Sequence, residues 1–136
     1  MAYLTSRTAR ERIKEAVFEK IAPGQPIQMA GRETYRILGC KVHARYCAQS
    51  AGNYKFNLNP NSLRADYELW ICGTDDLWYL IPISVIRQMY GHSDAYPDRH
   101  HSGIHVVSVD SRTHLAGYAR PSVSLDLTPY CKGVLR

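Results

Sequence analysis

The sequence has no long hydrophobic run, no closely spaced pair of cysteines, and fewer acidic than basic residues. No stretch approaches the roughly 18 apolar residues that a membrane-spanning helix needs. Charged residues interrupt the first fourteen positions, so we expect no signal peptide. The 4 cysteines include no Cys-x-x-Cys pair, which argues against a zinc site. These absences predict a cytoplasmic protein with reduced thiols.

What the chain does have is a basic balance and enough length for one core. Its 136 residues carry 17 Lys and Arg against 12 Asp and Glu, a net charge of +5. A positive charge favours polyanionic partners, because neutralising phosphates releases counterions. A hydrophobic content of 45% is ordinary for a globular domain. We therefore expect a single domain over residues 1–136 whose partner is nucleic acid and not a membrane.

Residue patterns predict two helices and several short strands. Thr8-Ala9-Arg10-Glu11 is a capping box that opens a helix ending before Pro23. Further expected elements are strands at 34–46, 54–58, 66–72, 77–83, 104–109 and 122–127, and a helix ending at Gly91. We expect 92–103 to be a loop, 111–121 to be irregular and the C-terminal tail to be loose. This order predicts an α/β domain with one mixed β-sheet flanked by helices: a core over 8–90, then a loop and C-terminal strands over 91–136.

Three motifs in that core resemble a known family. They are Tyr54-Lys55-Phe56-Asn57-Leu58, Ala65-Asp66-Tyr67 and Ile81-Pro82-Ile83-Ser84. Together with the order of elements over residues 8–90, they are similar to the PD-(D/E)XK (restriction-endonuclease-like) superfamily, in particular its small homing-endonuclease and resolvase-like members. The resemblance implies a restriction-endonuclease-like fold, DNA as partner, and Mg²⁺-dependent hydrolysis where the active site is intact.

The positions that should hold the catalytic groups are altered. Such nucleases bind Mg²⁺ with a carboxylate on one strand and a Glu or Gln on the next, followed two residues later by a lysine. Aligned with that pattern, His43 takes the place of the metal ligand and Arg45 that of the lysine. The preceding carboxylate would fall near Tyr35 and Arg36, and Glu33 is the nearest acid upstream.

Three interpretations follow from this departure. In the first, the chain is an active Mg²⁺-dependent endonuclease with a rearranged site: Glu33 and a helix carboxylate, Glu15 or Glu19, bind the metal, and Arg45 replaces the lysine beside His43. In the second, which we favour, the site is degenerate and the basic sheet binds nucleic acid without cutting it, since Mg²⁺ requires oxygen ligands. In the third, the alignment is wrong and the fold is unrelated.

The side chains expected to contact nucleic acid lie on the predicted strands and the turn between them. Alternation places Tyr54, Phe56 and Leu58 in the core and leaves Lys55 and Asn57 on the opposite face. Trp70 and Trp78 lie in apolar strands and are expected in the core. The predicted nucleic-acid-binding residues are Arg36, Arg45, Lys55, Asn57 and Arg64.

Two further hypotheses come from a histidine-rich segment and from alternative partners. Asp98-Arg99-His100-His101 resembles the start of an HNH nuclease motif, but no Asn follows Asn61 in the chain, which favours a solvated loop over 92–105. The function predicted overall is binding of DNA in preference to RNA, with homodimerisation possible. An interaction or regulatory module for another protein, built on a nuclease-like fold, is the alternative from a different class.

Overall fold

The computed structural model describes residues 6–48 and 52–135, with side chains from Ala9 onward. Two α-helices and nine strands form this part of the chain. Their bounds are α1 Ser6–Ile21, β1 Ile27–Gly31, β2 Thr34–Ile37, β3 Cys40–Cys47, β4 Asn53–Leu58, β5 Tyr67–Cys72, β6 Trp78–Pro82, α2 Ile83–Tyr90, β7 His105–Asp110, β8 Leu115–Ala119 and β9 Val123–Asp126, with 3₁₀ turns η1 Pro60–Arg64 and η2 Thr128–Tyr130.

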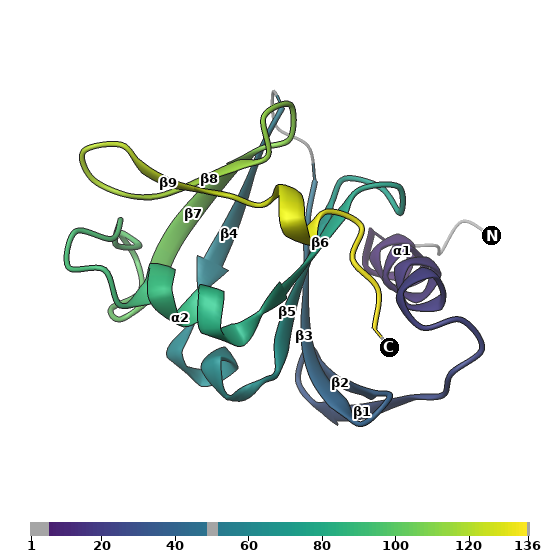
Figure 1. The fold of residues 1–136 in the computed structure, drawn as a ribbon. Helices are drawn as coiled ribbons and strands as arrows, with labels where there is room; N and C mark the ends of the chain where they lie inside the picture. Colours follow the sequence, from purple (N-terminus) through teal and green to yellow (C-terminus); the bar gives the residue numbers. More distant parts are fainter. Residues whose placement is uncertain (1–5, 49–51, 136) are drawn as a thin grey trace.

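The strands divide into two sheets (Figure 1). The first is mixed and five-stranded, in the order β1-β2-β3-β5-β6, and its one parallel pair is β3 with β5. The second is antiparallel and four-stranded, in the order β4-β7-β8-β9. A parallel pair needs a crossover connection, and β4 with η1 supplies it between β3 and β5.

Strands β5 and β6 of the first sheet are covered on both faces, which gives three layers there. On β5, Leu69 and Ile71 point to the face covered by α1, whose Val17 and Ile21 are fully buried there. Trp70 points to the opposite face, which packs on the second sheet. Successive side chains of a strand point to opposite faces, so an apolar run such as β5 serves both cores.

An aromatic pair joins the two sheets. The indole of Trp70 stacks on the ring of Phe56 in β4, with centroids 4.7 Å apart and planes 7° from parallel. Burial of Trp70, Trp78 and Phe56 confirms that these aromatics belong to the core. The exposure of Lys55 and Asn57 on the outer face of β4 also follows the predicted alternation.

The predicted single α/β domain with a mixed sheet and flanking helices is confirmed, and a second sheet adds to it. The pattern over 54–58 did not reveal which sheet it joins, because alternation fixes a buried face but not its neighbour. The hairpin of β5 and β6 and the helix ending before Gly91 agree with the sequence prediction. The loop over 92–103 does as well.

Four local predictions were wrong. The segment 34–46 is not one strand, because the chain turns at Leu38 and Gly39 and forms the antiparallel hairpin of β2 and β3. The first helix begins at Ser6, two residues before Thr8. Residues 111–121 include β8, whose Gly-containing sequence gives a weak strand signal but which pairs with strands on both sides. The tail is not loose: the Leu135 amide donates to the carbonyl of Ile21 (2.8 Å), and the indole of Trp78 donates to the carbonyl of Gly133 (3.0 Å).

No helix in residues 6–48 or 52–135 is both long and apolar enough to cross a membrane.

Candidate nucleic-acid interface

Strand β3 places His43 and Arg45 on the face that looks toward the second sheet. Their neighbours Val42 and Ala44 are fully buried against the α1 side, and the two basic residues alternate with them. His43 is 8% exposed, whereas the Arg45 side chain keeps 24% of its surface in solvent. The site therefore has a buried imidazole and a partly accessible guanidinium.

Glu68 of β5 lies beside them with its carboxylate fully buried. The parallel register of β3 and β5 pairs His43 with Glu68 directly. The indole Nε1 of Trp70 donates to Oε1 (2.8 Å), and the hydroxyl of Ser62 in η1 donates to Oε2 (2.8 Å). Each carboxylate oxygen thus has a hydrogen-bond donor that fixes its position.

Both basic residues lie close to this carboxylate without ordinary hydrogen-bond geometry, and Arg45 forms an ion pair with it. Nε of Arg45 lies 3.4 Å from Oε1 of Glu68, and Nδ1 of His43 lies 3.8 Å from the same oxygen. Both nitrogens are buried and lack a hydrogen-bond partner among the described residues. We name His43, Arg45, Ser62, Glu68 and Trp70 the Glu68 cluster.

The cluster keeps Glu68 ionised. Burial alone would raise the pKa of this carboxyl, but His43, Arg45 and the indole of Trp70 together hold it below its ordinary value of 4.5. A buried carboxylate is expensive to desolvate, so its charge is retained only where cations and donors surround it. The ion pair with Glu68 therefore restrains the buried Nε of Arg45, while part of this side chain stays in solvent.

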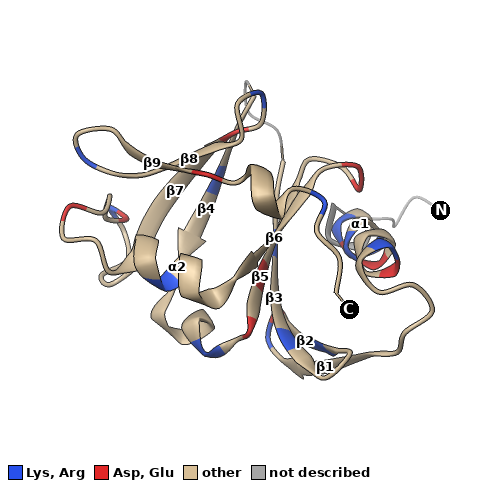
Figure 2. Cartoon of the chain, in the orientation of Figure 1, with Lys and Arg blue, Asp and Glu red and all other residues tan. Residues whose placement is uncertain are grey.

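Two exposed basic residues continue the same face of the sheet. Arg36 of β2 pairs in register with Lys41 of β3, and Thr34 pairs with His43. Residues opposite each other across a ladder share a face, as do residues two apart in a strand. Figure 2 shows basic residues, in blue, on both β2 and β3. We name Arg36, Lys41, His43 and Arg45 the basic strip.

The basic strip borders a shallow hollow and an acidic neighbour. The hollow has a volume of about 220 Å³, and Gln28, Arg36 and Gly39 contribute to its walls. The carboxylate of Asp66 accepts a hydrogen bond from the backbone amide of Lys41 (2.8 Å). The strip is therefore not uniformly basic, and Asp66 limits it on the side of β5.

The structure divides the predicted binding residues between different surfaces. Arg36 and Arg45 lie together on the basic strip. Lys55 and Asn57 lie on the outer face of the second sheet, pointing away from the core that separates the sheets. Arg64 is exposed on η1, the turn that also carries Ser62. Alternation along each strand was read correctly, but the relation between strands depends on the two-sheet arrangement.

The acids predicted to bind Mg²⁺ are not gathered into a ligand set. Glu33 forms an ion pair with Lys14 of α1, and the carboxylate of Glu19 accepts a hydrogen bond from the amide of Gly24 (3.0 Å). Glu15 is exposed on α1. Within the described ranges no group of three or more His, Cys, Asp or Glu could hold a metal ion.

The groups around Glu68 do not fit Mg²⁺ either. The cation prefers several oxygen ligands, and here one carboxylate, Glu68, is surrounded by His43 and Arg45. Both oxygens of Glu68 already accept hydrogen bonds from protein groups. No chemical step through a metal follows from this arrangement, and the roles predicted for Glu33, Glu15 and Glu19 stay predictions.

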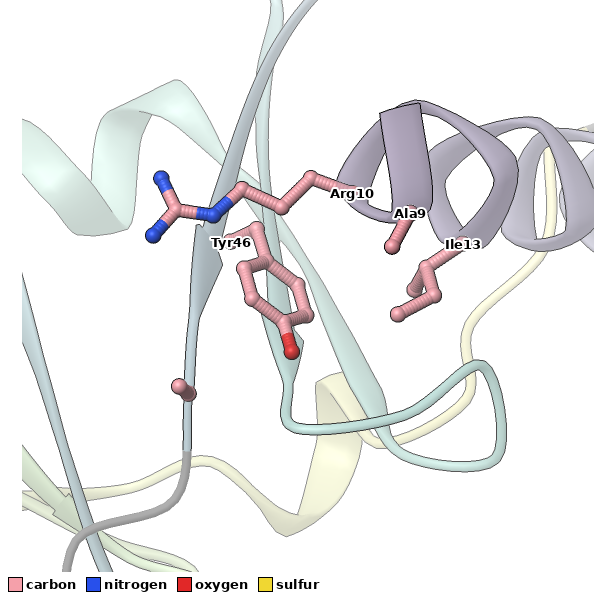
Figure 3. A pocket seen from close by; sticks show the side chains of 5 residues that line it. Ala9, Arg10, Ile13 and Tyr46 are labelled. Atoms are coloured by element: carbon pink, nitrogen blue, oxygen red, sulfur yellow. The ribbon is translucent and has the colours of Figure 1, made fainter. Parts of the chain in front are cut away.

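A second hollow lies on the other face of the sheet, between α1 and the end of β3 (Figure 3). Its volume is about 270 Å³, and Ala9, Ile13 and Tyr46 line it together with Arg10. The guanidinium of Arg10 lies over the ring of Tyr46, 5.6 Å from its centroid, and the Tyr46 hydroxyl donates to the carbonyl of Gly73 (2.9 Å). Arg10 and Tyr46 are therefore engaged in contacts within the protein, where α1 packs on the sheet.

Sequence reasoning missed Glu68 and Ser62. A signal was present, because Glu68 is the one charged residue within the otherwise apolar β5 sequence Tyr-Glu-Leu-Trp-Ile-Cys. An acid in a strand buried on both faces needs a partner, and charged residues are almost never fully buried without one. Ser62 gave no comparable signal, since its role depends on how η1 folds against β5.

Comparisons with protein-family models, with curated proteins and with solved structures find no match for this chain.

Proposed function

We propose that this protein binds nucleic acid, DNA in preference to RNA, through the basic strip, and that binding does not require hydrolysis of the phosphodiester backbone. The observation that carries the proposal is the anchoring of Arg45 by the buried Glu68, on the same sheet face as the exposed Arg36 and Lys41. Arg64 on the neighbouring η1 turn would add a peripheral phosphate contact.

Anchoring favours phosphate recognition for an entropic reason. A free arginine side chain loses rotamer freedom when it binds a phosphate, whereas Arg45 is already restrained by its ion pair with Glu68. Guanidinium groups present several donors in a planar fork that suits phosphate oxygens. Arg36 and Lys41 are exposed and supply the long-range attraction that draws a polyanion to this face.

The altered catalytic positions support binding over cleavage. The resemblance to the PD-(D/E)XK scaffold remains part of the proposal, with His43 and Arg45 where a nuclease has its metal ligand and lysine. Phosphodiester hydrolysis on that scaffold needs Mg²⁺, and the Glu68 cluster offers the wrong donors for it. A pseudo-nuclease that retains the nucleic-acid surface fits both observations.

The test is binding of a fluorescent duplex followed by anisotropy between about 50 and 200 mM salt. We expect affinity to fall steeply with salt, and the Arg36→Ala and Lys41→Ala variants each to reduce the slope of log K against log salt by about one. Lys55→Ala is the matched control, because this lysine is exposed on the outer face of the other sheet and should leave the slope unchanged.

A cleavage assay separates the alternatives. Supercoiled plasmid incubated with Mg²⁺ or Mn²⁺, and with EDTA as control, should stay intact while the binding assay is positive. Metal-dependent cutting that is lost in Glu33→Ala would replace the proposal with an active endonuclease. Absence of any affinity for single-stranded, duplex or branched nucleic acid would leave the protein-interaction module as the better hypothesis.

A further inference from the structure

The edge strand β1 is exposed along its whole length. All five residues of Ile27–Gly31 are exposed, and Met29 keeps 67% of its surface in solvent. Its partner on one side is β2, and no described strand pairs with its other side. An edge strand leaves a row of unpaired backbone donors and acceptors that another chain can satisfy.

The other outer strands are protected in ways that β1 is not. At the opposite edge of the first sheet, Tyr79 of β6 bridges Cys131, and the Lys132 amide donates to the carbonyl of Trp78 (2.8 Å). In the second sheet, β4 carries Lys55 and β9 carries Asp126. Charges and covering segments are the usual protection of sheet edges. β1, with the sequence Ile-Gln-Met-Ala-Gly, has neither a charge nor a proline.

The sequence of β1 suits pairing with itself. In an antiparallel arrangement centred on Met29, the Met29 residues of two copies face each other, and Gln28 faces Ala30. Beyond the strand, Arg32 faces Pro26, so no like charges meet. Ile27 and Met29 lie on the same sheet face as Tyr35 and Ile37 of β2, which places apolar side chains next to each other across the new junction.

We propose that β1 is a homodimer interface, in which two copies pair their β1 strands antiparallel about Met29 and form one continuous ten-stranded sheet. Such pairing supplies backbone hydrogen bonds along the strand and covers the exposed Met29 and Ile27. The occupant of this edge is thus a second copy of the chain, because the edge carries no charge that would select an acidic or basic partner.

The dimer deepens the proposed function, on which this step rests. Antiparallel pairing keeps equivalent sheet faces on the same side, so both basic strips would face one direction. The β2 strands of the two copies would be three strand spacings apart, which is roughly 14 Å. That is close to the major-groove width of about 12 Å in duplex DNA. The two Arg36 side chains could then reach phosphates on the two sides of a groove.

The test is a charge-swap experiment at Met29 followed by sedimentation velocity. The wild-type chain should sediment with twice its 15.5 kDa mass at micromolar concentration. Met29→Lys and Met29→Glu place like charges opposite each other and should each give the monomer mass. An equimolar mixture of the two variants should recover the dimer. Leu115→Lys, at an exposed apolar position on β8 of the other sheet, is the matched control and should remain dimeric.

A second measurement covers variants that fail to fold. Met29→Cys should form an intermolecular disulfide on mild oxidation, since opposite residues in antiparallel strands lie within disulfide range. Any of four results would overturn the interface. The wild-type protein could be a monomer, or Met29→Lys could leave the dimer intact. The folded charge variants could fail to recombine, or Met29→Cys could fail to cross-link. A monomer whose DNA affinity still depends on Arg36 would leave the proposed function standing, whereas a dimer without affinity for nucleic acid would refute that function and not the interface.

Discussion

Nε of Arg45 lies 3.4 Å from Oε1 of Glu68, a carboxylate that solvent does not reach. The two residues come from the adjacent parallel strands β3 and β5. Their ion pair joins a fully buried carboxylate to a side chain that is partly exposed. Hydrogen bonds from Trp70 and Ser62 fix the carboxylate of Glu68, whereas the side chain of Arg45 is only partly restrained. Stability and the proposed phosphate recognition therefore depend on the same carboxylate.

Removing the charge of Glu68 should destabilise the fold strongly. Glu68→Gln keeps an oxygen for the indole of Trp70 but leaves Arg45 without a counterion, and breaking a buried pair costs about 3–5 kcal/mol. Urea unfolding followed by tryptophan fluorescence measures the change. Asp76→Asn serves as control, since that side chain is 82% exposed and should change the free energy of unfolding by less than about 0.5 kcal/mol. Equal effects of the two variants would contradict the cluster.

Glu68 should stop stabilising the folded state within a defined range of acidic pH. Its pKa in the folded protein lies below the ordinary value of 4.5, because His43 and Arg45 outweigh the opposing effect of burial. A lowered pKa means that the folded state binds fewer protons, so the stabilisation is present above 4.5 and is lost as the pH falls below it. The stability difference between wild type and Glu68→Gln should shrink in that range, measured by urea unfolding at successive pH values. A difference that is constant from neutral pH down to about 3 would contradict this linkage.

Cys72 should be the least reactive of the four thiols. Burial in the core between the sheets raises its pKa to about 12, and the thiolate is the reactive form. Cys40, Cys47 and Cys131 are partly exposed. In the native protein a thiol reagent should modify these three while Cys72 stays unmodified, as peptide mass mapping would show. Denaturant should release the fourth thiol, and rapid native labelling of Cys72 would argue that the two sheets separate readily.

A substitution in the turn between β2 and β3 should stabilise the protein. Leu38 has φ of 51° and Gly39 has φ of 77°, so both central residues of this two-residue loop are left-handed. A leucine is strained there, whereas asparagine tolerates this region. Leu38→Asn should raise the free energy of unfolding by about 0.5–1 kcal/mol, and it also removes an apolar side chain from the surface. Gly39→Ala is the opposing control and should destabilise; a stable Gly39→Ala variant would contradict the turn geometry.

Strands β3 and β4 separate what a local pattern predicts from what depends on the fold. Alternation correctly placed Phe56 inside and Lys55 outside, because the two-residue period of a strand is a local property. The predicted nucleic-acid-binding set also grouped Lys55 with Arg45, and the structure separates them because β4 and β3 belong to different sheets. Glu68 was missed for a related reason: its partners come from β3 and η1, which are distant in the chain.

The sequence by itself determined the class of the fold, the faces of most strands and the basic character of the chain, since each follows from composition or from the period of neighbouring residues. Only the tertiary structure decided that β4 starts a second sheet, that Glu68 gathers His43 and Arg45, and that β1 is left uncovered. Those outcomes depend on which strands, distant in the chain, pair with each other, because that pairing decides which apolar surface is buried and which groups surround a buried charge. The lone acid in β5 indicates that Glu68 needs a partner, but no local pattern in the sequence identifies that partner.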